Sequence, residues 1–261
     1  MEIPKLEIRA PTRGNRRLEA LLAAANGDRR LHAWWYMQQV NADRRDMSDH
    51  SWVHIQIVAN IALRLFRLLN RAGIEPAMVS THGMGPHDAE VVIAAACLFH
   101  DTGMSIHRTD HEQYSLFLAA DRLPQLLAGI YEEPELTVIT SEALHAVIGH
   151  RRRGDPVTVE AGIVRVADAL DMASGRSRIP FETRRPNIHS ISAAAIDAVT
   201  IEPGEERAVR IEIEMNNSAG LFQVDELLAT KLRGSGIEEH IEVVAQIDAE
   251  HEKRLVPVFR I

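Results

Sequence analysis

Cysteine is almost missing from this chain. Cys97 is the single cysteine among 261 residues, so no intrachain disulfide can form, and thiolate-rich zinc or iron–sulfur sites are excluded. Cys97 itself falls inside an apolar run, where a lone cysteine is typical of a small core residue. Any metal ion bound by this chain must therefore be held by histidine and carboxylate side chains.

Long hydrophobic runs are missing too. No stretch approaches the roughly 18 uncharged apolar residues of a membrane span, and the first residues, Met1 to Lys5, lack the apolar core of a signal peptide. The sequence also has no glycine-rich phosphate loop, internal repeat or low-complexity tract. We therefore expect a cytoplasmic protein with no membrane partner.

Lysine is scarce, because among the 29 Lys and Arg residues only Lys5, Lys231 and Lys253 are lysine. Arginine binds carboxylates and phosphates in a bidentate manner, although genome composition can produce the same bias. The formal net charge of −8 disfavours a general nucleic-acid binder. An apolar content of 46% with 25% charged residues is typical of a soluble globular protein.

Histidine, by contrast, is concentrated in the middle of the chain. Nine of the 13 histidines lie between positions 50 and 150, namely His50, His54, His82, His87, His100, His107, His111, His145 and His150. His100 and Asp101 follow directly on the apolar run Val91–Phe99, which predicts a helix buried on all sides, and Gly103 then favours a helix end. An ionised carboxylate there must be paired or bind a metal ion, since its desolvation costs several kcal/mol. Taken alone, such a pair is more often a plain N–H to carboxylate contact.

Three further predicted helices carry candidate ligands. The apolar stripe of a helix from residue 48 or 49 to about 72 reaches His54, which could also be an ordinary hydrogen-bonded core histidine. A helix from about 111 to 120, with Asp110 as its expected N-cap, puts His111 in the first turn. In a helix from about 140 to 151, His150 shares a face with small residues, whereas His145 lies about 140° around the axis. We favour His150 and keep His145 as the reserve candidate.

The predicted helix over residues 160–173 sets three charged side chains, Arg165, Asp168 and Asp171, among apolar ones. Two carboxylates at i and i+3 on a buried helix need cations close by. Arg165 can pair with one carboxylate while a metal ion binds the other. The alternative is an internal Arg–Asp pair with no metal.

Beyond about residue 180 the pattern becomes that of a small α+β unit. Residues 196–201 and 207–215 alternate as a β-hairpin, and a helix over about 220–233 and strands over 241–247 and 255–259 are expected. We predict a mainly α fold: N-terminal helices (1–44) packed on an all-α core (45–184), followed by a small α+β domain (185–261).

The order His54, His100-Asp101, Asp168 on successive buried helices resembles the HD superfamily of metal-dependent phosphohydrolases. The resemblance spans roughly residues 45–180 and includes HDTG after a buried helix and VADALD, which is similar to the terminal Asp motif of the family. It implies that these four residues hold one metal ion. It further implies helices of an HD-type fold around that ion.

Members of the family with two metal ions add two histidines, to which His111 and His150 correspond, with Asp101 then bridging the ions. The resemblance is incomplete at Met104, where two-metal members often carry a lysine. The positive charge that a phosphate needs must then come from other side chains, of which the following are available: His107, Arg108, Arg151, Arg152, Arg153, Arg176 and Arg178. We expect Asp101, His107 and Arg108 to be catalytic.

The resemblance implies a phosphodiesterase or phosphatase that cleaves a nucleotide or cyclic-nucleotide phosphoester by attack of metal-activated hydroxide. Imidazole and carboxylate ligands suit one or two ions of iron, manganese, zinc, cobalt or nickel. Two alternatives stay open: a di-iron oxygenase similar to myo-inositol oxygenase, and a metal-stabilised regulatory domain. The expected partner is a small phosphorylated substrate rather than nucleic acid, and the C-terminal domain could support a homo-oligomer.

Overall fold

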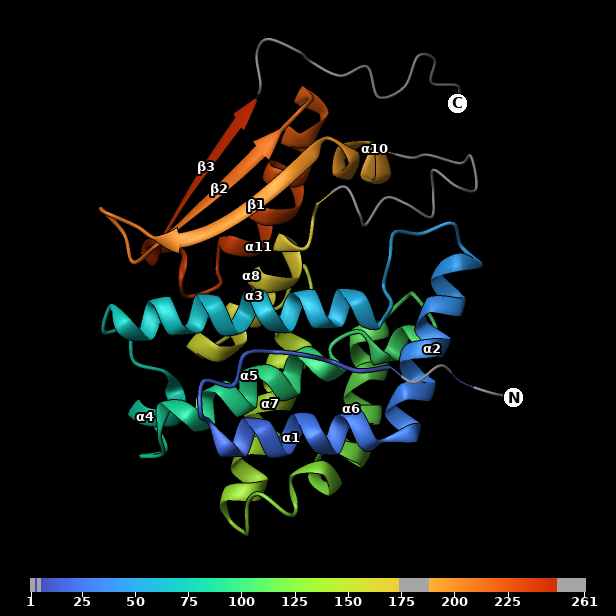
Figure 1. The fold of residues 1–261 in the computed structure, drawn as a ribbon, viewed down its shortest axis with the longest axis vertical. Coiled ribbons are helices and arrows are strands. Elements are labelled where there is room, and N and C mark those ends of the chain that lie inside the picture. The colour runs from blue at the N-terminus through green and yellow to red at the C-terminus, as the bar shows by residue number, and fades with distance from the viewer. Residues whose placement is uncertain (1–2, 4–5, 174–187, 248–261) are drawn as a thin grey trace.

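The computed structural model describes residues 3, 6–173 and 188–247, and it is mainly helical (Figure 1). The helices of its first part are α1 (Arg16–Gly27), α2 (Arg29–Asp43), α3 (Trp52–Arg71), α4 (Ala77–Ser80), α5 (Pro86–Phe99), the 3-10 turn η1 (Thr102–Ser105), α6 (His111–Leu127), α7 (Glu135–Gly149) and α8 (Val159–Leu170). Asn15 and Asp28 cap α1 and α2, because each side chain accepts hydrogen bonds from backbone N–H groups of the first turn.

Helix α5 is the centre of the helical part. Every residue from Asp88 to Phe99 is buried, and α3, α7 and α8 pack around it. Trp35 of α2 closes one side, since its indole Nε1–H donates to the Leu98 carbonyl oxygen at 3.1 Å. This packing explains the continuous apolar run, and it delivers the next two residues, His100 and Asp101, into the interior.

The C-terminal part holds α10 (Ile188–Ala194) and a three-stranded sheet in the order β1 (Ile196–Pro203), β2 (Val209–Met215) and β3 (Ile241–Ile247). β1 and β2 form the predicted antiparallel hairpin, and β3 runs parallel to β2. The sheet lies on the side of α3 (Figure 1), where the Nε of Arg64 donates to the Ile201 carbonyl oxygen at 2.5 Å. The predicted fold class, mainly α with a small C-terminal α+β part, is therefore confirmed.

Several predicted helix ends differ from the structure. Asp110 has a left-handed backbone (φ 59°) and makes no side-chain cap, and α6 continues through Pro124 to Leu127 instead of ending near residue 120. Phe117, in the middle of α6, is 72% exposed. Helix α7 begins at Glu135, earlier than predicted.

The segment from 218 to 232 is not the single helix that was predicted. It consists of the 3-10 turn η3 (Ser218–Gly220), the π-helical segment η4 (Gln223–Ala229) and the short helix α11 (Thr230–Leu232). The 3-10 turn η5 (Glu238–His240) follows before β3. The predicted strand over 255–259 lies outside the described residues, and the domain boundaries stay a prediction.

Helix α3 is long and apolar enough to cross a membrane by those two measures, but half of its apolar window is buried inside the protein. Its buried stripe runs from His54 through Val58 to Leu69. Packing in the helical core therefore accounts for its composition.

Candidate metal centre

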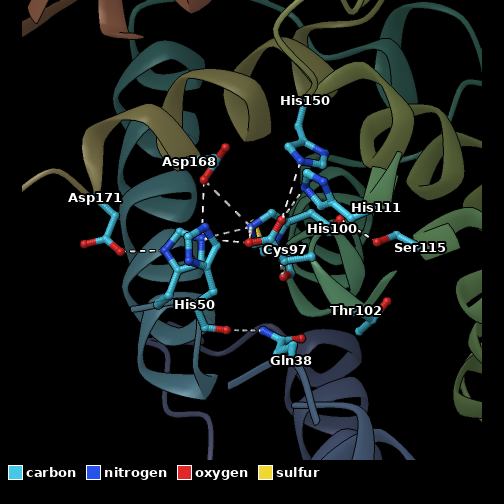
Figure 2. A network of polar contacts seen from close by, with 12 residues as sticks. Gln38, His50, Cys97, His100, Thr102, His111, Ser115, His150, Asp168 and Asp171 are labelled. Atoms are coloured by element: carbon cyan, nitrogen blue, oxygen red, sulfur yellow. Dashed lines mark hydrogen bonds and ion pairs between the residues drawn. The ribbon is translucent and has the colours of Figure 1, made fainter. Parts of the chain in front are cut away.

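Six side chains from distant parts of the chain converge in the interior of the helical part (Figure 2). They are His54 in the first turn of α3, His100 and Asp101 directly after α5, His111 at the start of α6, His150 at the end of α7, and Asp168 in α8. These are the six side chains that the sequence predicted as metal ligands. The structure brings all of them together.

The first group of ligand atoms surrounds the Nε2 of His54. This nitrogen lies 3.1 Å from His100 Nε2, 3.4 Å from Asp101 Oδ2 and 3.3 Å from Asp168 Oδ1. Ligands that sit about 2.1 Å from one ion at tetrahedral or octahedral angles are themselves about 3.0–3.5 Å apart. The spacing therefore fits one divalent cation held by two imidazoles and two carboxylates.

The second group uses the other oxygen of the same aspartate. Asp101 Oδ1 lies 3.0 Å from His111 Nε2 and 3.8 Å from His150 Nε2. These three residues form a second set of donor atoms close enough to hold an ion. Asp101 thus presents one oxygen to each set, so its carboxylate would contact both ions if each set held one.

In three of the four converging histidines the remaining ring nitrogen faces an acceptor, whereas His111 Nδ1 lies 2.8 Å from the Arg108 guanidinium and 3.1 Å from the Arg108 carbonyl oxygen. His54 Nδ1–H donates to Asp171 Oδ2 at 2.5 Å, and His100 Nδ1–H donates to the Cys97 carbonyl oxygen at 2.8 Å. In the same way His150 Nδ1 lies 2.5 Å from the Val147 carbonyl oxygen. Such contacts fix the tautomer and leave the Nε2 lone pair for a metal ion.

Gly103 determines where His111 lies. A Cβ at this position would come within 1.9 Å of the His111 carbonyl oxygen and 2.5 Å of the Ser115 backbone nitrogen, so only glycine allows the turn after Asp101 to touch the start of α6. The Ser115 hydroxyl strengthens this contact by donating to the His100 carbonyl oxygen at 2.7 Å and accepting from Gly103 N–H at 2.8 Å. The glycine of HDTG is thus a close-contact residue inside η1 rather than a helix stop, because α5 already ends at Phe99.

Burial and charge set the ionisation of the ligands. Burial lowers the pKa of His100, and burial together with the positive charge of Lys231 lowers the pKa of His150 to about 3. Burial alone would raise the pKa of Asp101 and of Asp168, but the neighbouring histidines, and Lys231 beside Asp168, hold both well below the usual range. Neutral imidazoles and ionised carboxylates are the forms that bind a metal ion.

A pocket of about 350 Å³ opens onto the second group of ligands. Asp101, His111, His150 and Asp168 form part of its wall. Among the described residues, the positively charged side chains that line it are those of Arg108, Arg151, Arg152 and Lys231. The pocket therefore joins the ligand cluster to a cationic rim, partly balanced by Glu112 and Glu226.

Some predicted residues do not reach this pocket. His107 is exposed and contacts Arg45 at 3.1 Å, because the chain leaves the η1 turn toward the surface. His145 is also elsewhere, since its Nε2 accepts a hydrogen bond from Val157 N–H at 3.0 Å. Arg153 is not among the lining residues, and Arg176 and Arg178 lie outside the described part of the chain.

The predicted pairing of Arg165 with a carboxylate of its own helix is wrong. Its guanidinium donates to backbone carbonyl oxygens, among them those of Arg151 and Lys231, both at 2.7 Å. Asp171 instead orients His54, and Asp168 pairs with Lys231 through Oδ2.

Lys231 and His50 line the pocket but were not predicted as site residues. Lys231 lies 63 positions from its partner Asp168, so no local pattern links them, and the scarcity of lysine was the one available signal. His50 precedes α3 and lines the pocket, and its ring centroid lies 5.6 Å from that of His54. In the sequence, His50 was marked only as one of the nine histidines between positions 50 and 150.

Comparison with known proteins agrees with this geometry. The family model of the HD domain matches residues 49–173, a range that contains all six converging residues. The chain belongs to the HD domain family, which is part of a metal-dependent hydrolase-type superfamily. Among relatives, a protein of Methanocaldococcus jannaschii with the name Uncharacterized protein MJ1020 is 38% identical over 207 residues, which cover 79% of this chain and 80% of that protein.

Proposed function

We propose that this protein is a phosphohydrolase that uses two divalent metal ions to cleave a phosphoester bond in a small, nucleotide-type substrate. One observation carries the proposal: the two oxygens of Asp101 face two separate sets of ligand atoms, one around His54 and one around His111. Divalent ions about 3.5–4 Å apart lower the pKa of bound water and neutralise phosphoryl oxygens during in-line attack. The donor set, of imidazoles and carboxylates only, fits such ions.

The chain's own residues would act on the substrate as follows. Asp101 sets the separation of the two ligand groups, and Asp168 and the histidines fix their orientation. The cations of the pocket rim, among them Arg108 and Arg151, bind the non-bridging phosphoryl oxygens and replace their hydration. In the reaction the oxygen of water bonds to phosphorus, the ester P–O bond breaks, and a proton of the water ends on the leaving oxygen.

The cationic rim also favours a phosphoester over the neutral substrate of an oxygenase. Four Arg or Lys side chains line a pocket of about 350 Å³, and bidentate arginine is suited to phosphate. A volume of this size lies at the lower end of small-molecule sites, which suits a mononucleotide-sized substrate.

The test is a phosphoester screen with protein purified without chelators and loaded with manganese, iron, zinc, cobalt or nickel. We expect turnover of at least one mono-, di- or cyclic phosphoester, reduced at least about a hundredfold in Asp101→Asn. His145→Gln is the matched control, because this histidine sits on the same helix as His150 but accepts a hydrogen bond from Val157 N–H instead of joining the centre. A metal-loaded protein that cleaves none of these substrates, or a mixed-valent di-iron signal with oxygen consumption, would contradict the proposal.

A further inference from the structure

Lys231 carries a positive charge from the C-terminal part of the chain into the pocket. Its ammonium group pairs with Asp168 Oδ2, whereas Asp168 Oδ1 is the oxygen that faces His54. The Lys231 side chain is 16% exposed and lines the same pocket as Arg108 and Arg151. An ammonium group has three N–H donors, so the contact with Asp168 leaves donors that a pocket ligand can use.

We propose that Lys231 anchors the phosphoryl group of the substrate and that Arg165 is the positioning residue that holds Lys231 there. The inference rests on the proposed function and deepens it. Met104 occupies the position at which two-metal members of the family often carry a lysine, and its side chain is fully buried. Lys231 brings the missing charge to the ligand cluster from a different element.

Arg165 joins two segments that both border the pocket. Its Nε donates to the Lys231 carbonyl oxygen at 2.7 Å and its Nη2 to that of Thr230 at 3.3 Å. The same guanidinium donates to the carbonyl oxygens of Arg151, Arg152 and Gly154 at 2.7–3.0 Å. These three residues belong to the loop that directly follows His150.

The free-energy cost of burying the Arg165 guanidinium explains why the two segments that it contacts are held together. Arg165 is 3% exposed, and a buried charge is tolerated only when its donors are satisfied. Here carbonyl oxygens from both segments satisfy them, so neither segment can move away without leaving a charged donor unpaired. The loop with Arg151 and Arg152 and the backbone that carries Lys231 are therefore fixed relative to each other.

A second contact, one turn earlier on α8, has the same effect. A Cβ on Gly162 would come within 2.0 Å of the Ser235 carbonyl oxygen, so the backbone after α11 rests directly on the helix. Gly162 and Arg165, at i and i+3, share one face of α8. This face holds the segment from Lys231 to Ser235, while Asp168, one turn further, binds the Lys231 side chain.

The first experiment measures inorganic phosphate binding to metal-loaded protein by calorimetry, together with metal content and steady-state kinetics. In Lys231→Met we expect phosphate affinity to fall at least about tenfold, KM to rise more than kcat falls, and metal content to stay unchanged. Lys231→Arg restores most of the affinity. Arg64→Lys is the control, because Arg64 also links the helical part to the C-terminal sheet but lies away from the pocket.

Three results would overturn the inference: no phosphate binding by the wild type, unchanged phosphate affinity in Lys231→Met, or loss of a metal ion from that variant, which would limit Lys231 to holding Asp168. Phosphate binding does not require turnover. A wild type that binds phosphate through Lys231 yet hydrolyses no phosphoester would therefore refute the proposed function and leave the anchoring role supported.

The role of Arg165 is tested by a double-mutant cycle with Arg165→Lys, which keeps a charge but loses the planar fork that reaches both segments. We expect phosphate affinity to fall severalfold in Arg165→Lys with metal retained. Because Arg165 acts through Lys231, adding Lys231→Met should then cost less than it does in the wild type. Fully additive effects, or a phosphate affinity equal to that of the wild type in Arg165→Lys, would contradict the positioning role.

Discussion

At the scale of single residues, the centre depends on partners that never touch a metal ion. The Nδ1 atoms of His54, His100 and His150 each face an acceptor, and for His54 this acceptor is the carboxylate of Asp171. A carboxylate partner raises the basicity of a ligating imidazole more than a carbonyl does. Asp171 is therefore expected to strengthen the first group of ligands specifically.

Asp171→Asn tests this expectation, since asparagine keeps the shape and an acceptor oxygen but removes the charge. The affinity for one of the two metal ions should fall about 10- to 100-fold, measured by competition with a chelating dye. Asp43→Asn, at an exposed position on α2, serves as the control. Equal affinities in wild type and Asp171→Asn would show that the contact has no influence on metal binding.

The residues proposed as ligands could be predicted from the sequence, but the contacts of Lys231 and Arg165 could not. His54, His100 and Asp168 interrupt or follow apolar stretches of helices, where a buried polar side chain is costly unless it has a partner or binds a ligand. Lys231 comes from a segment with no such signal. Arg165 was assigned a carboxylate partner because charges pair with charges, whereas its actual partners are backbone carbonyl oxygens, which every residue has and no sequence pattern marks.

At the scale of elements, the position of α6 was the least predictable feature that matters for the site. The apolar pattern did not reveal that α6 starts after a left-handed residue, Asp110, or that it continues past Pro124. What places His111 next to Asp101 is the close contact of Gly103 with the start of α6. Such a contact depends on tertiary packing rather than on local propensity.

Gly103→Ala should disturb this contact directly. Because the new methyl group would overlap the His111 carbonyl oxygen, we expect the free energy of unfolding to fall by about 1–3 kcal/mol or more, and the ion bound by His111 and His150 to be lost first. Urea denaturation and metal analysis measure the two effects. Gly129→Ala is the control, since nothing lies within 4 Å of a Cβ there; a similar small effect of both variants would contradict this account of Gly103.

At the scale of the whole molecule, the fold concentrates ionisable groups that are stable only in their metal-binding forms. Helices α3, α5, α7 and α8 bury His100 and His150 as neutral groups and Asp101 as a carboxylate, and they surround the partly exposed carboxylate of Asp168. The C-terminal part completes the wall of the pocket with Gln223, Glu226, Leu227 and Lys231. The sequence predicted β1, β2 and β3 close to their observed bounds, but not the contribution of that part to the pocket.

Acid should destabilise the metal-free protein for this reason. The pKa of His150 falls from 6.5 to about 3 on folding, so below pH 6.5 the unfolded chain binds a proton that the folded chain does not. The free energy of unfolding therefore decreases as the pH falls from 6.5 toward 3, and the lowered pKa values of Asp101 and Asp168 act in the same direction at lower pH. Urea titrations across this range should show the decrease, with a shallower slope in His150→Gln; stability independent of pH would contradict the burial of neutral histidine.

The number of metal ions bound per chain tests the central claim most directly. Protein purified without chelators, saturated with manganese or zinc and freed of excess ion, is analysed by inductively coupled plasma mass spectrometry. The bridging arrangement of Asp101 predicts two ions per chain in the wild type and in His145→Gln, and one ion in His150→Gln. A wild type that binds one ion or none at saturation, or a His150→Gln variant that still binds two, would contradict the claim that Asp101 joins two metal sites.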